Sequence, residues 1–361
     1  MARTYNNLYP QIYDFERLYY AYLKARRNKR YRHEVLEFTA RLEEELIILQ
    51  NELIYHTYRP GRPRVFVVHD PKTRVIMAPP FRDRVVHHAL VAIIEPIFER
   101  GFIYDSYACR VGKGTHAGAD RVTEFLRRAQ RQWGRVYCLK GDVSQYFPSI
   151  HHPTLKALIR KRIACPSTLW LIDTIIDSTV DEGDPCPRGL PVGNLTSQLF
   201  ANVYLNELDQ FVKHTLRVRY YVRYMDDFVI LHHDKRALWD VKREIECFLA
   251  DRLLLQLNRK TSVFPISQGI DFLGYRIWPT HRLLRKSSIK RARRGFKKLA
   301  RDYAEGKIPL ERVKASIMSW LGHCKHANTY RIREKVLSEV VLVRSSDGGH
   351  ERAVNEPKTA V

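Results

Sequence analysis

The chain has 361 residues, 45% of them hydrophobic, which is enough to bury a large core divided among two or three subdomains. Its 62 lysine and arginine residues outnumber 39 acidic ones, and the formal charge of +23, spread along the chain, favours a polyanionic partner such as nucleic acid. Membrane-spanning, secreted and structural-zinc proteins are disfavoured: no hydrophobic run could span a bilayer, the first residues lack a signal-peptide core, and the six cysteines form no Cys-x-x-Cys pair. We therefore expect a cytoplasmic protein.

Helices and strands alternate along the chain without internal repeats, which predicts a mixed α+β fold. Residues 11–57 are predicted to be helical, because Leu42, Leu46 and Leu49 recur at helical spacing. Residues 345–361 are polar and expected to be disordered. The other predicted elements are strands at 65–68 and 74–77 around a turn at 70–73, helices at 82–99 and 116–131, a buried strand at 136–140, helices at 153–162 and 167–177, an acidic loop at 181–193, a helix at 195–214, strands at 220–223 and 228–232, a helix at 235–252, short strands within 262–277, and a basic helical segment from 287 to about 341.

Two adjacent acidic residues, Asp226 and Asp227, follow Tyr224 and Met225 between two strand-like runs. Aspartate is a common turn residue, so a solvated turn would explain this motif taken alone. Asp142, however, stands at the end of another predicted strand. If the strands are neighbours, the carboxylates converge, and their repulsion calls for a cation.

Carboxylate oxygens of this kind suit Mg²⁺, which completes its coordination shell with phosphate and water. Two such ions, roughly 3.5–4 Å apart, can activate an attacking 3′-hydroxyl and stabilise the leaving pyrophosphate. Nucleotidyl transfer needs little beyond this positioning and charge. The acidic residues alone predict a polymerase or a nuclease equally well.

Several motifs in order resemble the palm of a reverse transcriptase over about residues 60–330. The resemblance implies an RNA-directed DNA polymerase with a right-hand α+β fold of fingers, palm and helical thumb. The motifs are Asp142-x-x-x-x-Phe147, Gly-Leu-Pro-Val-Gly-Asn-Leu-Thr-Ser-Gln at 189–198, Tyr-Met-Asp-Asp at 224–227, Leu-Asn-Arg-Lys-Thr at 257–261 and Phe-Leu-Gly-Tyr at 272–275.

In detail the chain looks most like the reverse transcriptases of bacterial or phage diversity-generating retroelements. The form of the motif at 189–198, Tyr-Ala-Cys-Arg at 107–110 with Gly-Lys-Gly-Thr-His at 112–116, and the stretch 272–290 carry this likeness. The resemblance implies error-prone copying of a template-repeat RNA into cDNA that diversifies a target gene. It also implies a small basic accessory protein, alongside template RNA, the RNA–cDNA duplex and dNTPs.

The resemblance assigns roles position by position. The expected metal-binding positions are Asp142, Val143, Asp226 and Asp227, which would hold two Mg²⁺ ions that Mn²⁺ can replace. Asp227 would also lie near the primer end. Lys260 would protonate pyrophosphate, although a solvated lysine is a close alternative.

The expected nucleotide-binding positions lie upstream and in the middle motif. Lys72 and Arg74 would grip the triphosphate, a role that suits an ammonium paired with a guanidinium. The remaining nucleotide-binding candidates are Arg110 as a further cation, Phe147 beneath the sugar, where it would exclude a 2′-hydroxyl or simply pack in the core, Val192 and Gln198.

Val192 departs from the retroviral pattern, in which a glutamine at this position contacts the nucleotide. A β-branched hydrophobic side chain cannot make that hydrogen bond, so we expect looser selection among bases. The alternative is a packing variant without effect on fidelity.

The expected domains are an N-terminal helical extension (1–58), fingers (59–135), palm (136–283) with a fingers insertion around 153–190, a helical thumb (284–344) and a tail (345–361). The basic residues after Arg285 would track the duplex backbone. Leu273 and Gly274 would form the primer grip, where glycine permits close approach. The early helices could bind RNA or the accessory protein, and the sequence does not choose between them.

Three alternatives remain open. The chain could be another bacterial reverse transcriptase of the group II intron, retron or phage-defence type, although the short C-terminus leaves little room for a maturase extension. It could be a non-catalytic RNA-binding scaffold, or a two-metal nuclease.

Overall fold

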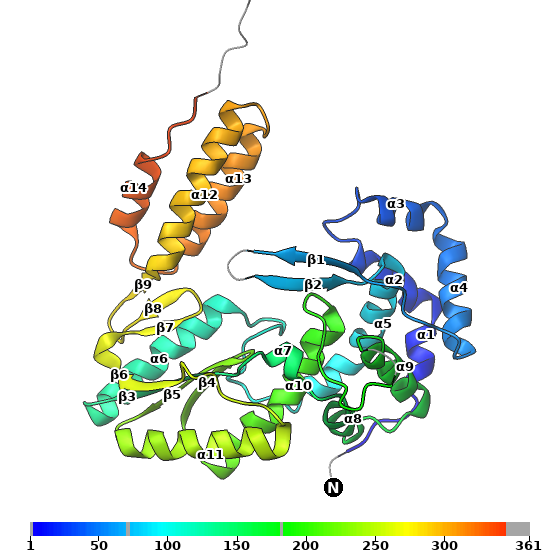
Figure 1. Cartoon of the computed structure of the whole chain (residues 1–361), viewed down its shortest axis with the longest axis horizontal. Coiled ribbons are helices and arrows are strands. Elements are labelled where there is room, and N and C mark those ends of the chain that lie inside the picture. Colours follow the sequence, from blue (N-terminus) through cyan, green and yellow to red (C-terminus); the bar gives the residue numbers. More distant parts are fainter. Residues whose placement is uncertain (1–2, 70–72, 181–182, 344–361) are drawn as a thin grey trace, which may run out of the picture. The chain divides into compact units, whose positions relative to one another are not determined.

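The computed structural model describes residues 3–69, 73–180 and 183–343, and the chain forms two compact units, Met1–Gln268 and Gly269–Val361. Both units contain helices and strands, which confirms the α+β class (Figure 1). In the described part of the chain, no helix combines the length and hydrophobicity needed to cross a membrane.

The N-terminal segment, predicted as continuously helical, consists of four helices: α1 (Tyr9–Tyr13), α2 (Phe15–Ala25), α3 (His33–Ala40) and α4 (Leu42–Ile54). Local polar chemistry sets the breaks. Asp14 caps α2 by accepting a hydrogen bond from the Arg17 N–H at 3.0 Å. Asn28 takes a left-handed conformation, with φ of 62°, in the turn before α3.

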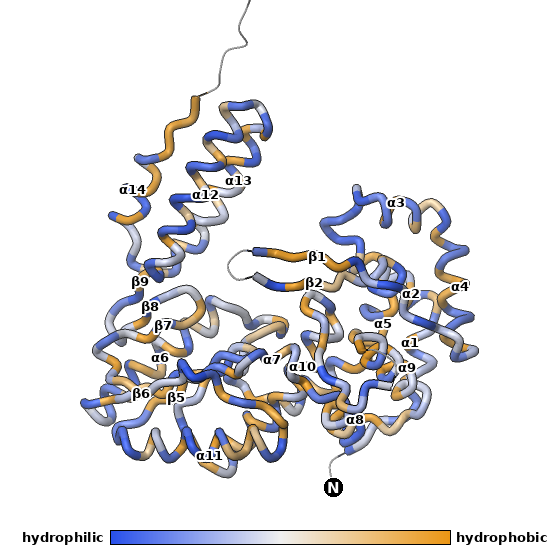
Figure 2. The backbone as a smooth tube through the Cα atoms, in the orientation of Figure 1, coloured by the Kyte–Doolittle hydropathy of each residue, from blue (hydrophilic) through white to orange (hydrophobic). Residues whose placement is uncertain are grey.

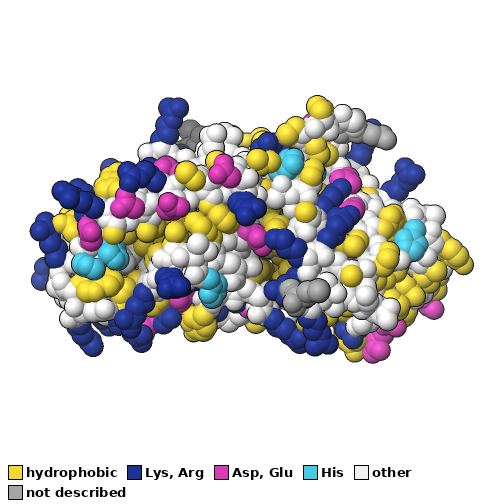
Figure 3. Space-filling view, turned by 90° about the horizontal axis from the view of Figure 1, so that it is seen from below, with side chains coloured by type: hydrophobic (Ala, Val, Ile, Leu, Met, Phe, Trp, Pro, Cys, Tyr) yellow, Lys and Arg dark blue, Asp and Glu magenta, His cyan; other side chains and the backbone are white. Residues whose placement is uncertain are grey.

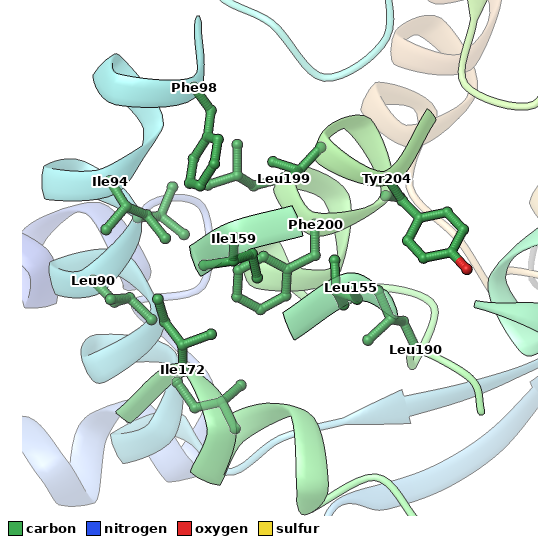
Figure 4. Packing of buried hydrophobic residues seen from close by; sticks show 14 of the residues in the cluster. Leu90, Ile94, Phe98, Leu155, Ile159, Ile172, Leu190, Leu199, Phe200 and Tyr204 are labelled. Atoms are coloured by element: carbon green, nitrogen blue, oxygen red, sulfur yellow. The ribbon is translucent and has the colours of Figure 1, made fainter. Parts of the chain in front are cut away.

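A hydrophobic core joins α5 (Phe81–Glu99), α8 (His152–Arg160), α9 (Pro166–Asp177) and α10 (Leu195–Gln210). Figure 4 shows the side chains of these helices pointing toward one another around Phe200. Burying each large side chain contributes on the order of 1.5–3 kcal/mol, so this core anchors the loop at 189–194 that precedes α10. The labelled members are Leu90, Ile94, Phe98, Leu155, Ile159, Ile172, Leu190, Leu199, Phe200 and Tyr204.

The predicted hairpin is present as β1 (Arg64–Val68) and β2 (Arg74–Ala78), which pair antiparallel with Val65 opposite Met77. The hairpin is strongly hydrophobic, as Figure 2 shows, and yet exposed: Val65 is 57% exposed and Val75 56%. Part of its predicted turn, residues 70–72 with Lys72, lies outside the described residues.

A four-stranded antiparallel sheet in the order β4-β5-β3-β6 forms the base of the candidate site. Helix α11 packs along β3, β5 and β6, below the sheet in Figure 1, and α6 packs against β4 and β5. The bounds are α6 Thr115–Trp133, β3 Tyr137–Asp142, β4 Tyr220–Tyr224, β5 Asp227–His232, α11 Lys235–Leu253 and β6 Ser262–Pro265, with α7 at Tyr146–Ser149, a π-helical turn at Phe211–Thr215 and a 3₁₀ turn at Ile266–Gln268.

The second unit contains a three-stranded sheet, β7 (Ile270–Phe272), β8 (Tyr275–Ile277) and β9 (Arg282–Leu284), followed by three helices. The sequence predicted one basic helical segment here. Gly306, with φ of 70°, and Pro309, the N-cap of the second helix, account for its first break. The helices are α12 (Lys286–Ala304), α13 (Leu310–Cys324) and α14 (Tyr330–Ser338).

Candidate active site

The structure brings the three predicted aspartates together at one end of the four-stranded sheet. Asp142, the last residue of β3, lies directly opposite Asp227, the first residue of β5. Asp226 stands in the turn between β4 and β5, and its carbonyl accepts a hydrogen bond from the Val143 N–H at 3.3 Å. The β3 end and the hairpin turn are therefore joined through backbone as well as by sheet register.

The turn itself is conformationally strained. Met225 adopts a left-handed backbone with φ of 54°, which costs a residue other than glycine on the order of 1–3 kcal/mol. Strain of this kind persists only where surrounding contacts hold it, and it is common at functional sites. Contacts around the β4–β5 turn therefore maintain its strained backbone.

Electrostatic repulsion is concentrated on Asp226. Burial raises the pKa of Asp226 to about 7, and the negative charges of Asp142 and Asp227 act in the same direction. The Asp226 and Asp142 carboxyl groups are also close enough to share a hydrogen bond. A divalent cation between them would favour the ionised form of Asp226, which the protein environment alone disfavours.

The described residues contain no group of three or more His, Cys, Asp or Glu side chains preassembled to hold a metal ion. Asp142, Asp226 and Asp227 are therefore not placed so that all three carboxylates could bind one metal ion together. Two carboxylates, Asp142 and Asp226, still fit Mg²⁺, because this ion usually takes one or two protein carboxylates and completes its shell with water and phosphate.

Asn258 supports Asp142, a role that the sequence did not assign. Its backbone N–H donates to the Asp142 carbonyl at 2.7 Å, and its Nδ2 donates to Asp142 Oδ2 at 3.1 Å. The Lys260 N–H donates to Asn258 Oδ1 at 3.0 Å, while the Lys260 side chain is exposed. The sequence shows the motif at 257–261, but only the fold shows that Asn258 is the residue that contacts the Asp142 carboxylate.

Comparison with known proteins decides the family. The family model described as reverse transcriptase (RNA-dependent DNA polymerase) matches residues 69–277, more than half of the chain. The chain belongs to the reverse transcriptase family. It is therefore an RNA-directed DNA polymerase by family, as the motifs predicted.

Two relatives show how far this similarity extends. Protein YkfC of Escherichia coli is 32% identical over 292 residues, covering 69% of this chain and 74% of YkfC. The group II intron-encoded protein LtrA of Lactococcus lactis is 26% identical over 339 residues, covering 74% of this chain but only 55% of LtrA. This reverse transcriptase thus spans about half the length of LtrA. A solved apo telomerase from Candida tropicalis has a TM-score of 0.47 and 14% identity, with coverage of 65% of this chain and 58% of that one.

Phe147 and Val192 of the reverse transcriptase lie on connected segments. Phe147 is partly buried against Tyr146, with ring centroids 5.6 Å apart, and its carbonyl accepts a hydrogen bond from the Leu190 N–H at 2.9 Å. Val192 follows two residues later and is half-buried. Gly193, with φ of 111°, then turns the chain into α10.

Gln198 lines a cavity of about 270 Å³ whose lining does not include the three aspartates. Lys29, Arg32 and Arg84 line the cavity, with Arg84 in an ion pair with Glu34 at 3.2 Å, and His87 and His88 complete this side of it. Burial, followed by the charges of Arg84 and Arg32, lowers the pKa of Lys29. Cations that repel one another around a cavity create a favourable site for an anion.

The Arg110 guanidinium does not take the nucleotide-binding position expected for it. Its guanidinium Nε contacts both carboxylate oxygens of Glu99 at 2.9 Å, and Nη1 donates to the Ile103 and Ser106 carbonyls at 2.7 Å. These bonds engage a side chain that is only 6% exposed, so Arg110 braces its own loop rather than presenting a charge to a triphosphate. Arg74, by contrast, is exposed at the start of β2.

Proposed function

We propose that this reverse transcriptase copies RNA into cDNA by two-metal nucleotidyl transfer, with Asp142 and Asp226 as the metal-binding carboxylates. The observation that carries the proposal is the convergence of these two carboxyl groups from a strand end and a held turn, with the pKa of Asp226 raised to about 7. When bound, the divalent ions would activate the primer hydroxyl and stabilise the leaving pyrophosphate.

The residues around this centre have distinct tasks in the proposal. Asp227 lies beside the primer end, and Phe147 supports the incoming sugar and excludes a 2′-hydroxyl. Arg74, with Lys72 preceding it in the sequence, binds the triphosphate. Lys260 donates a proton to the departing pyrophosphate.

The proposed domains are those expected from the motifs: N-terminal extension at 1–58, fingers at 59–135, palm at 136–283 with an insertion around 153–190, and thumb at 284–344. Packing divides the chain between Gln268 and Gly269, before the proposed start of the thumb. The β7–β9 sheet thus groups with the helices that follow it, and we infer that the primer grip at Leu273 and Gly274 acts together with those helices.

Uncopied template RNA is assigned to the basic cavity around Gln198. The cavity shares Arg32, Ala78, Pro79 and Arg84 with a neighbouring groove, which adds Arg62 and Arg64 and is also lined by Glu34 and Glu37. A run of cations along connected cavities matches a phosphodiester backbone better than a single anion. Lysine and arginine side chains are also distributed over the face shown in Figure 3.

Primer extension on an RNA template with Mg²⁺ tests the activity. The wild-type chain should extend the primer, and an Asp226→Ala, Asp227→Ala variant should lose on the order of 10²–10³-fold or more in rate. Asp251→Ala, which removes an exposed carboxylate on α11, is the matched control and should extend normally. Degradation of the nucleic acid without nucleotides present would instead indicate a nuclease, and binding without extension would indicate a scaffold.

The finer assignment is a diversity-generating retroelement enzyme that makes error-prone cDNA from a template-repeat RNA with a small basic accessory protein. The middle motif, Gly193 to Gln198 preceded by Val192, supports it. Val192→Gln should restore a hydrogen bond to the nucleotide and lower misincorporation opposite adenine. Sequencing cDNA from both proteins measures this, and an unchanged error spectrum would reject the role of Val192.

The similarity to LtrA favours a second candidate, a reverse transcriptase of the group II intron type. Genomic context separates the two, because a retroelement enzyme should neighbour a template and variable repeat pair with an accessory gene. Sequencing of cDNA made on the adjacent RNA, with and without the neighbouring proteins, gives the same distinction biochemically.

A further inference from the structure

The turn that carries Asp226 rests on a buried ion pair. Arg223, in β4, and Asp209, in α10, are both fully buried. The guanidinium binds the carboxylate in a two-pronged manner, with Nε donating to Oδ1 at 2.7 Å and Nη2 donating to Oδ2 at 2.6 Å. The Tyr221 hydroxyl donates to the same Oδ1 at 2.7 Å, so the carboxylate is fixed in orientation.

The third guanidinium nitrogen reaches the turn. Arg223 Nη1 donates to the Met225 carbonyl at 2.9 Å and to Asn202 Oδ1, also on α10, at 3.3 Å. Met225 is the residue in the left-handed conformation, immediately before Asp226. One side chain therefore ties helix α10 to the peptide that presents the metal-binding carboxylate.

The backbone of Arg223 is held as well. Its N–H donates to the Asp105 carbonyl at 2.9 Å, and its carbonyl accepts from the Tyr107 N–H at 2.9 Å. On the other side of the turn, the Val143 N–H binds the Asp226 carbonyl. The turn is thus fixed from α10 through Arg223 and from β3 through Val143.

Stability alone does not account for this pair. Removing two charges from water is costly, and hydrophobic residues of similar volume often hold a fold equally well or better. A hydrophobic pair could not, however, direct an N–H donor at the Met225 carbonyl. A lysine would keep the charge but lacks the rigid fork that binds Asp209 and the carbonyl together.

We propose that Arg223, oriented by Asp209, is a positioning residue that holds the Met225–Asp226 turn so that the Asp226 carboxylate faces Asp142, and that it thereby sets the affinity of the site for divalent cations. The inference rests on the proposed polymerase function. Supporting groups one step away from metal ligands typically change metal affinity or activity by roughly 10- to 100-fold when removed.

The test uses the full chain in primer extension, with Mg²⁺ varied at saturating nucleotide. Arg223→Met alone leaves Asp209 buried and unpaired and can fail to fold, so the double variant Arg223→Met, Asp209→Leu carries the test. This variant leaves the buried Tyr221 hydroxyl without its acceptor and should lose some stability, but it should remain folded at the assay temperature and need roughly 10- to 100-fold more Mg²⁺ for half-maximal rate. Its KM for dNTP should stay close to the wild-type value.

A control replaces a more exposed ion pair in the same unit. Lys156 binds both carboxylate oxygens of Asp177, joining α8 to α9, and Lys156→Met, Asp177→Leu should leave the Mg²⁺ midpoint unchanged. Arg223→Lys should shift the midpoint nearly as far as the double variant, because charge without the fork does not hold the turn.

A wild-type midpoint in the folded double variant, or in Arg223→Lys, would overturn the inference. A loss of rate that follows thermal stability with no change in the midpoint would assign the pair a purely structural role and overturn it too. Absence of extension by the wild-type chain would instead refute the proposed function.

Discussion

Asp226 combines burial with two acidic neighbours, and its raised pKa has a consequence for stability. An ordinary aspartate loses its proton near pH 3.8, whereas Asp226 in the folded chain keeps it to about 7. Between these two pH values the Asp226 carboxyl is ionised in the unfolded chain and protonated in the folded chain. The metal-free fold therefore loses stability as pH rises, by at most about 1.4 kcal/mol per pH unit. Above about 7 the loss levels off.

In metal-free buffer, Asp226→Asn should therefore raise the unfolding temperature at about pH 8 and change it little at about pH 4. Added Mg²⁺ should stabilise the wild-type chain more at the higher pH, because protons compete with the cation. Thermal unfolding across this pH range measures both effects, with Asp251→Asn as an exposed control. A gain in stability of the wild-type chain relative to Asp226→Asn as the pH rises from about 4 to 7 would contradict the account.

The acidic residues were predictable from sequence because a motif carries them as neighbours or at a strand end. The supporting contacts were not. The sequence does not separate Arg110 from Arg223, and only the fold shows that Arg110 pairs with Glu99 while Arg223 donates to the Met225 carbonyl in the turn before Asp226. The contact of Asn258 with Asp142 could not be predicted either, because the two residues are distant in the sequence.

At the scale of elements, Gly141 shows how closely β3 and β5 pack. A Cβ added at Gly141 would lie 2.1 Å from Cζ of Phe228, its registered partner in β5. Gly141→Ala should therefore lower stability by roughly 1–3 kcal/mol through overpacking and shift Asp142 with it. Chemical denaturation and primer extension measure the two effects.

Gly141→Ala combined with Phe228→Leu should recover part of the stability, because a smaller partner makes room for the added methyl group. If Gly141→Ala is as stable and active as the wild-type chain, the tight β3–β5 contact is not needed to place Asp142.

Hydrophobic periodicity predicts the position of a helix or strand well where that element packs one face against the core. The boundaries within 11–57 and 287–341 were missed, because short capping and turn residues such as Asp14, Asn28 and Gly306 interrupt patterns that otherwise continue. Strand β3 pairs with β5 and with β6, which lie far from it along the chain. From the sequence alone, only the order of the motifs indicates that these strands are neighbours.

At the scale of the whole molecule, the charge of +23 predicts strongly salt-dependent RNA binding. The basic cavity should contribute specifically to single-stranded template. Lys29→Gln, Arg32→Gln should weaken binding of a primer–template with a 5′ template overhang and reduce its salt slope by roughly 0.7 per lost phosphate contact. Binding of a blunt duplex should not change.

Fluorescence anisotropy with both substrates measures this, and Lys235→Gln, Arg236→Gln on α11 removes the same charge from an exposed surface as a control. Equal losses on overhang and blunt substrates would indicate a diffuse charge effect. A raised KM for dNTP with unchanged overhang binding would reassign the cavity to the triphosphate.

Metal uptake by the two converging carboxylates is measured most directly by calorimetric titration of Mg²⁺ into the chain bound to primer–template and a non-reactive nucleotide. The wild-type complex should take up about two ions, and Asp142→Asn or Asp226→Asn should each lose at least one of them together with primer extension. Undiminished Mg²⁺ uptake by both variants would show that these carboxylates do not hold the catalytic metals.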